Sequence, residues 1–203
     1  MNKEKLLIAT TNQGKAREIK SSLQGLPLEI LSLDDLGDFE PFSEKGRTFD
    51  DNARGKSLFY SREWGGLTLA EDSGLEIEAL GGEPGVLSAR YSGPKATDKK
   101  NNQKVLERME DMPQERRKAR FVSCMVLSRR GEVIKEIKES VEGRIAFKKK
   151  GTYGFGYDPL FYYPSLEKTF AELLPEEKNE VSHRGRALKK LKEFLLGYLG
   201  SGL

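Results

Sequence analysis

The sequence predicts an α/β fold, and four stretches of the chain carry this prediction. Residues 6–9 form a short apolar run typical of a buried strand, and residues 16–23 then show the apolar spacing of a helix. Residues 67–70 form a second apolar run, and residues 75–79 alternate between apolar and charged side chains as in a half-buried strand. Strands that alternate with helical segments indicate the α/β class.

The remaining elements are predicted from the same patterns. They are a strand at residues 28–33, a helix that ends near Trp64, a helix at 98–109, two strands at 119–128 and 132–141 joined as a hairpin through Gly131, and a final helix at 187–199.

Length and composition narrow the function classes. The 203 residues fit one domain, spanning 1–203, with a sizeable core. The net charge of +3 is too small for a dedicated nucleic-acid binder. The first apolar run is too short for a signal peptide or a membrane span, so we expect no membrane partner. A single cysteine, Cys124, excludes an intrachain disulfide and fits a reducing cytoplasm.

A polar loop between the first strand and helix has the pattern of a phosphate-binding corner. It consists of Thr10, Thr11, Asn12, Gln13, Gly14 and Lys15. Backbone N–H groups at a helix start and the positive end of the helix dipole favour an anion. The loop lacks the leading glycine and the Ser/Thr after lysine of a Walker A motif. The same residues also fit a loop that only caps the helix.

Two adjacent acids follow the apolar run at residues 67–70. We expect Glu71 and Asp72 to lie where that strand ends, and Ser73 and Gly74 to turn the chain. Neighbouring carboxylates repel each other unless a cation or a shared proton relieves them. Oxygen ligands of this kind suit Mg²⁺ or Mn²⁺. The alternative is a solvated Glu-Asp turn.

A polar stripe precedes these acids on the helix that ends near Trp64. Thr48, Asn52 and Lys56 lie four residues apart and therefore share one face. A packing stripe is expected beside it, formed by Phe49, Ala53 and Tyr60. Hydroxyl, amide and ammonium groups in a row can hold an acid network or a phosphate, although a plain solvent-facing stripe fits the spacing equally well.

Residues 151–159 alternate glycines with aromatics and end in an acid and a proline. Glycine lets a ligand approach the backbone closely, and the rings of Phe155 and Tyr157 offer a stacking surface for a base. Asp158, when ionised, can only accept hydrogen bonds. The alternative is a glycine-rich loop packed on the core.

Near the C-terminus, Ser182 is a good N-cap residue, and His183 and Arg184 then begin a helix. Cations are disfavoured at a helix N-terminus, so an anion or another acceptor is expected close by. His183 is the only histidine, and a lone histidine is more often structural.

Together these groups suit a nucleoside triphosphate bound with Mg²⁺. The set comprises oxygen ligands at Glu44, Glu71 and Asp72, positive charge at Lys15, Lys56, Lys178 and Arg184, and stacking rings at Phe155 and Tyr157. A 6-oxo purine presents an N1–H donor beside an O6 acceptor. Asp158 with His183 or Arg184 would match that pattern and reject mispaired bases by up to roughly 10⁴-fold.

The sequence resembles the inosine triphosphate pyrophosphatase family, the XTP/dITP diphosphatases. The matching segments are ATTNQGK at residues 9–15, E-x-G-x-T-F-x-x-N-A at 44–53, AEDSGL at 70–75, GG-x-PG at 81–85, SARY at 88–91, GFGYDP at 154–159, Lys178, and SHRG at 182–185. They occur in the family's order and span nearly the whole chain.

The resemblance implies hydrolysis of ITP, dITP and XTP to the monophosphate and pyrophosphate, which removes these nucleotides before they enter DNA or RNA. It implies one or more Mg²⁺ ions, with Mn²⁺ as a substitute. It also implies an elongated, two-lobed fold around a mixed, twisted β-sheet flanked by helices, with the nucleotide in a cleft between the lobes, and a homodimer.

By motif position, the resemblance assigns roles to individual residues. Phosphates would be held by residues 10–15, with Lys56 and Ser73 as further substrate contacts. Asp72 would be the general base and a metal ligand, with Glu44 and Glu71 completing the acid cluster. The nucleotide, including its base, would contact Phe155, Gly156, Tyr157, Asp158, Lys178, His183 and Arg184.

One departure concerns Glu71, because many members have Asp there and a longer carboxylate shifts its oxygens by about one methylene. Two other functions stay open. One is a related pyrophosphatase acting on other modified nucleotides. The other is a nucleotide sensor without catalysis, against which the intact Asp72, Lys15 and Glu44 argue.

Overall fold

The structure is a computed structural model that describes residues 3–37 and 39–200. The ends of the expected domain, residues 1–2 and 201–203, lie outside the described residues. The strands are β1 (Glu4–Ile8), β2 (Leu28–Ser32), β3 (Leu67–Ile77), β4 (Lys118–Arg129), β5 (Glu132–Ile145), β6 (Phe161–Tyr163) and β7 (Lys168–Thr169). The α-helices are α1 (Gln13–Ser22), α2 (Phe49–Trp64), α3 (Asp98–Arg108), α4 (Pro175–Val181) and α5 (His183–Gly200).

The predicted α/β class is confirmed. The strands follow the order β2-β1-β3-β4-β5-β6-β7 in a mixed sheet. Strand β1 pairs in parallel with β2 and β3, whereas β6 pairs antiparallel with β5 and β7. The parallel pairing at β1 requires crossovers, and α1 and α2 supply them.

The chain divides into two compact units. The first contains Met1–Asp72, Ser123–Glu139 and Gly185–Leu203, and the second contains Ser73–Val122 and Ser140–Arg184. Strands β3, β4 and β5 therefore each contain residues of both units.

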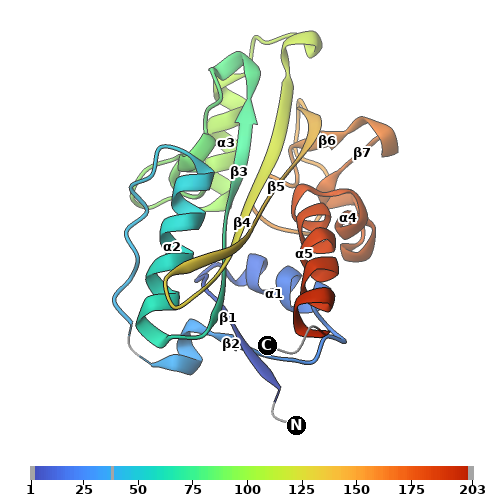
Figure 1. Ribbon diagram of the computed structural model, residues 1–203. Helices are drawn as coiled ribbons and strands as arrows, with labels where there is room; N and C mark the ends of the chain where they lie inside the picture. Colours follow the sequence, from blue (N-terminus) through green and yellow to red (C-terminus); the bar gives the residue numbers. More distant parts are fainter. Residues whose placement is uncertain (1–2, 38, 201–203) are drawn as a thin grey trace. The chain divides into compact units, whose positions relative to one another are not determined.

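In the first unit, successive residues of β1 pack against different helices. Leu6 and Ile8 belong to one core cluster with buried residues of α1 and α5, whereas Leu7 packs with Tyr60 of α2 in another. This alternation follows from the two-residue period of a strand. Both faces of this part of the sheet are thus covered, and Figure 1 shows α2 and α5 on opposite sides of it.

The second unit has its own core, which is rich in aromatic rings. Phe121, Phe161 and Phe170 pack together, with ring centroids 4.6 to 5.9 Å apart. Helix α3 contributes Val105, and Met109 follows at its end; neither has exposed surface. The predicted helix at residues 98–109 is confirmed within one residue of its end.

Strand β3 corrects one local expectation. The sequence favours a turn at Ser73 and Gly74, but β3 runs unbroken from Leu67 to Ile77. The glycine is needed for close packing, because a Cβ on Gly74 would lie 2.2 Å from Oγ of Ser88. That hydroxyl also accepts a 2.9 Å hydrogen bond from the backbone N–H of Leu75. Glu71 and Asp72 consequently lie inside a strand.

Other boundaries agree with the sequence. Helix α2 ends at Trp64, where Gly65 adopts the left-handed conformation with φ of 78°. Strands β4 and β5 are neighbours joined through Arg130 and Gly131, both with positive φ, which confirms the hairpin.

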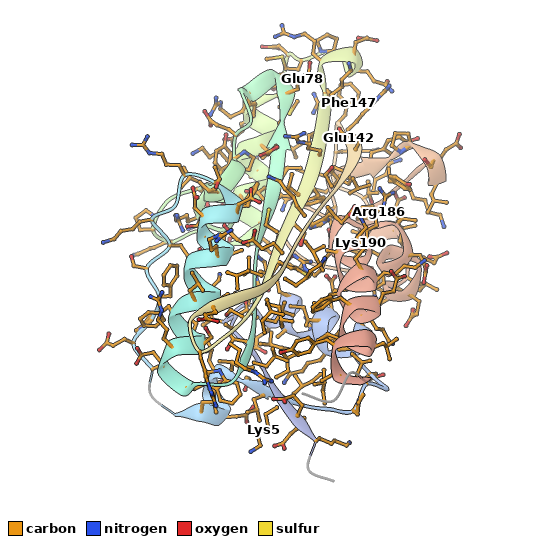
Figure 2. The ribbon with its side chains drawn as sticks, in the orientation of Figure 1. Lys5, Glu78, Glu142, Phe147, Arg186 and Lys190 are labelled. Carbon is orange, nitrogen blue, oxygen red and sulfur yellow. The ribbon has the colours of Figure 1, made fainter. Side chains whose placement is uncertain are left out.

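Charged side chains lie mainly on the surface of the units. Two examples are labelled in Figure 2. Nζ of Lys5 lies 3.8 Å from Oε1 of Glu29, and Lys190 forms an ion pair with Glu139. Among the residues that the structure describes, no helix has the length and apolarity needed to cross a membrane.

Candidate functional site

The predicted phosphate loop joins β1 to α1 as expected. Asn12 is the N-cap of α1, and its side chain accepts a 3.0 Å hydrogen bond from the backbone N–H of Lys15. The hydroxyl of Thr10 accepts from the backbone N–H of Asn12 at 3.2 Å. Thr11, Asn12 and Gln13 are exposed and Gly14 is buried. The loop therefore caps the helix and also leaves polar groups open to a ligand.

The two adjacent acids have separate partners on different elements. Glu71 accepts a 2.8 Å hydrogen bond from the hydroxyl of Ser123 on β4, and its other oxygen lies 3.7 Å from Nζ of Lys15. Asp72 accepts a 2.9 Å hydrogen bond from the side-chain amide of Asn52 on α2. Because consecutive residues of a strand face opposite sides, each carboxylate has its own donors, and the repulsion expected between neighbours is reduced.

Asn52 connects Asp72 to the segment that carries Glu44. The Oδ1 atom of Asn52 accepts a 2.8 Å hydrogen bond from the backbone N–H of Gly46. Two residues before that glycine, Glu44 pairs with Lys56 of α2. The polar stripe of Thr48, Asn52 and Lys56 thus organises an acid network, with Thr48 as the helix N-cap.

These surroundings raise the pKa of Asp72 above its ordinary value. Burial of the carboxyl is the largest cause, and the charge of Glu44 adds to it. Lys15, the hydrogen bond from Asn52, and Lys56 act in the opposite direction. A carboxylate with a raised pKa is a stronger base than an ordinary aspartate, and such perturbed groups are concentrated at functional sites.

The carboxylates form no complete metal cage by themselves. Within the described residues, no three His, Cys, Asp or Glu side chains lie close enough together to hold a metal ion. Mg²⁺ is commonly bound by one or two carboxylates together with phosphates of a substrate. Asp72 and Glu44, near enough for Glu44 to raise the pKa of Asp72, fit that kind of site.

In the second unit, the predicted nucleotide-binding loop wraps around Asp158. This residue is 2% exposed, and its Oδ2 atom accepts hydrogen bonds from the backbone N–H of Phe155 at 2.9 Å and from Nζ of Lys178 at 2.5 Å. Gly154 has a φ of +74°, and a Cβ there would lie 2.1 Å from the same oxygen. The glycine is therefore required by the close approach of the carboxylate.

Phe155 lies beside two cations. Nζ of Lys178 is 4.9 Å from the centroid of its ring, and Cζ of Arg184 is 5.4 Å away. Arg184 also donates a 2.9 Å hydrogen bond to the hydroxyl of Ser73. The structure thus brings together the aromatic, basic and hydroxyl groups that the sequence assigns to nucleotide binding.

Tyr157, predicted to stack on a base, and His183, predicted to donate to it, are both buried. Tyr157 is 4% exposed and its hydroxyl donates to the carbonyl of Ser88 at 2.8 Å; burial raises the pKa of this phenol. The ring of His183 stacks on Phe121 with centroids 4.7 Å apart. Of the two rings expected to stack on a base, Phe155 is the more exposed.

The comparison with known proteins now decides the family. The model of the Ham1 family matches residues 6–194, which include every residue of both groups described above. The chain belongs to the Ham1 family.

Relatives of this Ham1-family chain are similar over almost their whole length. The dITP/XTP pyrophosphatase of Thermoanaerobacter pseudethanolicus is 46% identical over 193 residues, covering 95% of this chain and 96% of that protein. The protein of the same name from Geobacter sulfurreducens is 47% identical over 191 residues, covering 94% and 96%.

A solved structure agrees with the fold. The Staphylococcus aureus Ham1 protein has a TM-score of 0.86 and 38% identity, covering 96% of this chain and 100% of that one. The structure of a nucleoside-triphosphatase, dITP/XTP pyrophosphatase, from Mycobacterium abscessus has a TM-score of 0.74 and 41% identity, covering 92% and 97%.

Some contacts of this Ham1-family protein go beyond what the sequence predicts. The stripe that carries Asn52 is predicted to hold an acid network or a phosphate, but its partner Asp72 is not predicted, and the contact of Ser123 with Glu71 has no local signal except a hydroxyl inside an apolar strand. Asp98 and Asn102 of α3 bind the backbone of Gly156, a contact that no local pattern indicates.

Proposed function

We propose that this chain hydrolyses the noncanonical purine nucleotides ITP, dITP and XTP to their monophosphates and pyrophosphate. The observation that carries the proposal is 46% identity, over 95% of the chain, to a protein named dITP/XTP pyrophosphatase. The buried, hydrogen-bonded Asp72 and the cations around it give that similarity a chemical basis. Removal of these nucleotides from the pool keeps them out of DNA and RNA.

In the proposed reaction, Asp72 is the general base. The oxygen of a water molecule bonds to the α-phosphorus, the bond to the bridging oxygen breaks, and pyrophosphate leaves. The proton of the water passes to Asp72. Asn52 holds one carboxylate oxygen by its hydrogen bond, so the carboxylate cannot turn freely.

The phosphates are assigned to residues 10–15, with Lys15 and Lys56 providing positive charge. The N-terminus of α1 adds backbone N–H groups, which favour an anion. Glu71, buried against Ser123 and near Lys15, is suited to positioning that lysine, and its predicted role as a metal ligand remains a proposal. Fixed charges that face the leaving group stabilise the transition state.

We propose Mg²⁺ as the cofactor, held by Asp72 and Glu44, with Mn²⁺ as a substitute. When bound, such an ion neutralises charge on the phosphates as the bond breaks. Hard oxygen donors of this kind are those that Mg²⁺ prefers.

Base recognition is assigned to the second unit. Asp158 would accept from N1–H of a 6-oxo purine, and His183 or Arg184 would donate to O6, with Phe155 stacking on the base. The loop geometry around Asp158 supports this assignment, because hydrogen bonds from the backbone N–H of Phe155 and from Nζ of Lys178 fix that carboxylate. Ser73 and Lys178 complete the proposed contacts.

The state of the protein in the cell also belongs to the proposal. We assign a single functional domain, supported by the family match over residues 6–194. A homodimer is carried over from the family resemblance. The cytoplasm is supported by the single, buried cysteine.

Product analysis tests the proposal. Purified protein is incubated with Mg²⁺ and ITP, XTP, GTP or ATP in parallel, in ¹⁸O-labelled water. We expect monophosphate and pyrophosphate from ITP and XTP, little product from GTP or ATP, and the label in the monophosphate. Orthophosphate would show that a different bond is cut. Tight ITP binding without turnover would favour the sensor.

The variant Asp72→Asn tests the assigned base in the same assay. It should lose about 10²- to 10⁴-fold in turnover while still binding ITP. The matched control is Asp111→Asn, the same change at an exposed residue, which should turn over ITP normally. Near-normal turnover by Asp72→Asn would refute the assignment.

A further inference from the structure

The predicted nucleotide-binding loop, residues 151–159, is hydrogen-bonded to side chains in the first turns of α3. The backbone N–H of Gly156 donates a 2.7 Å hydrogen bond to Oδ2 of Asp98. The carbonyl of the same glycine accepts a 2.7 Å hydrogen bond from Nδ2 of Asn102. The backbone N–H and carbonyl of Gly156 are thus both bound by side chains of the same helix.

Helix α3, which carries these two side chains, is held by hydrogen bonds and by burial in the core. Asn102 is 2% exposed, and its Nδ2 atom also donates to the backbone carbonyl of Asp98 at 2.6 Å. Thr97 caps the helix by accepting from the backbone N–H of Lys100 at 3.2 Å. On the same helix, Val105 is fully buried in the core of the unit. Helix α3, which carries Asp98 and Asn102, is therefore anchored in the core.

Gly156 lies between the side chains that are assigned to the base. Phe155 precedes it, and Asp158, two residues later, accepts from the backbone N–H of Phe155. Gly156 has a φ of +61°, a conformation that glycine adopts readily and other residues rarely do. Holding its N–H and carbonyl fixes the orientation of the peptide planes on both sides, and with them the direction of the ring and the carboxylate.

We propose that Asp98 and Asn102 are positioning residues for recognition of the purine base. They set the spacing between the ring of Phe155 and the carboxylate of Asp158, and thereby the discrimination of a 6-oxo purine from a 6-amino purine. This inference rests on the proposed function, because it assumes that this loop binds the base. The phosphates are assigned to residues 10–15, so their binding should not change.

Binding of the two products separately tests the inference. Inosine monophosphate carries the base, whereas pyrophosphate does not. In Asn102→Ala and in Asp98→Ala, the dissociation constant for inosine monophosphate, measured by calorimetry, should rise about tenfold, as for loss of one well-placed hydrogen bond. The dissociation constant for pyrophosphate should stay unchanged, and the ratio of kcat/KM for ITP over ATP should fall.

Two further variants make the test specific. Gln103→Ala removes a neighbouring exposed amide of α3, which binds only Glu107 in the described structure, and it should behave as wild type. Asp98→Asn retains an oxygen that can accept from Gly156 and should keep most of the affinity. Because Asp98 is exposed, its variants should fold even if Asn102→Ala does not.

The outcomes separate this inference from the proposed function. If wild type shows no selective turnover of ITP, the proposed function fails, whatever the variants do. If wild type is selective but folded Asn102 and Asp98 variants bind inosine monophosphate as tightly as Gln103→Ala, the inference is wrong. Equal loss of affinity for inosine monophosphate and pyrophosphate would also overturn it, because it would indicate general damage.

Discussion

The side-chain amide of Asn52 donates a 2.9 Å hydrogen bond to Oδ2 of Asp72, across 20 residues of sequence. Asn52 is 1% exposed, and its other amide atom accepts from the backbone N–H of Gly46 at 2.8 Å. One buried side chain therefore fixes both the assigned base and the segment that follows Glu44. Removing such a buried side chain is costly, because its former partners stay buried without a hydrogen bond and without water in its place.

Replacing Asn52 should reduce catalysis more than binding. Asn52→Ala removes this hydrogen bond from the Asp72 carboxylate, and a misplaced catalytic group can cost about 10²-fold in kcat. Steady-state kinetics with ITP would show the loss in kcat with a smaller change in KM. Arg54→Ala is the control on the same helix, since Arg54 is exposed and pairs only with Glu136 in the described structure. An unchanged kcat in Asn52→Ala would contradict the positioning role.

Gly46 should tolerate no side chain. A Cβ there would lie 2.6 Å from Oδ1 of Asn52 and 2.7 Å from Cβ of Asp51. Gly46→Ala should therefore displace Asn52 and lower kcat by roughly tenfold. Combined with Asn52→Ala, it should add little further loss, because the two changes act through one contact.

The control for Gly46 is Gly197 of α5, around which a new Cβ would meet nothing within 4 Å. Gly197→Ala should leave kcat unchanged and raise the free energy of unfolding by up to about 1 kcal/mol, the helix preference of alanine over glycine. Equal effects of the two alanines on kcat would refute the steric explanation.

Arg117 should be a strong determinant of stability in the second unit. The residue is 2% exposed. Its guanidinium donates hydrogen bonds of 2.7 to 3.2 Å to four backbone carbonyls, those of Met109, Met112, Ile145 and Ala146. The ring of Phe147, labelled in Figure 2, lies 4.3 Å from its Cζ atom. Burial lowers the pKa of this guanidinium.

Arg117→Ala leaves several buried carbonyls without that donor and should lower the free energy of unfolding by roughly 2–5 kcal/mol. Urea denaturation followed by circular dichroism measures this. Arg116→Ala, the same change at the exposed neighbouring residue, should stay within about 0.5 kcal/mol of wild type. Similar stabilities for the two variants would contradict the structural role.

Cys124 should be unreactive in the folded protein. The thiol is buried, and burial together with the charge of Asp50 raises its pKa far above the usual value of about 8.5. Iodoacetamide should label the native protein slowly at pH 8 and gain little at pH 10, because thiolate does not form. After unfolding in guanidinium chloride, labelling should be fast and rise with pH. Native labelling at the unfolded rate would show that the thiol is accessible.

Two glycines, Gly131 and Gly74, are both predicted from the local sequence to turn the chain. Gly131 does turn the chain, with φ of 79°, but Gly74 lies inside β3 because Ser88 approaches it closely. The difference depends on a residue 14 positions further along the chain, which local composition does not report.

The sequence by itself determined the elements of this protein and the types of group at its site. Strand and helix periods, the end of α2 at Trp64, the hairpin at Gly131 and the acid, lysine and glycine-aromatic segments are all properties of neighbouring residues. Tertiary structure alone decided which of these groups touch. Hydrogen bonds join Asn52 to Asp72, Ser123 to Glu71, and both Asp98 and Asn102 to Gly156, over separations of 20 to 58 residues. Such contacts arise from the packing of whole helices on a sheet, and that packing is set by the summed burial of many side chains rather than by any local pattern.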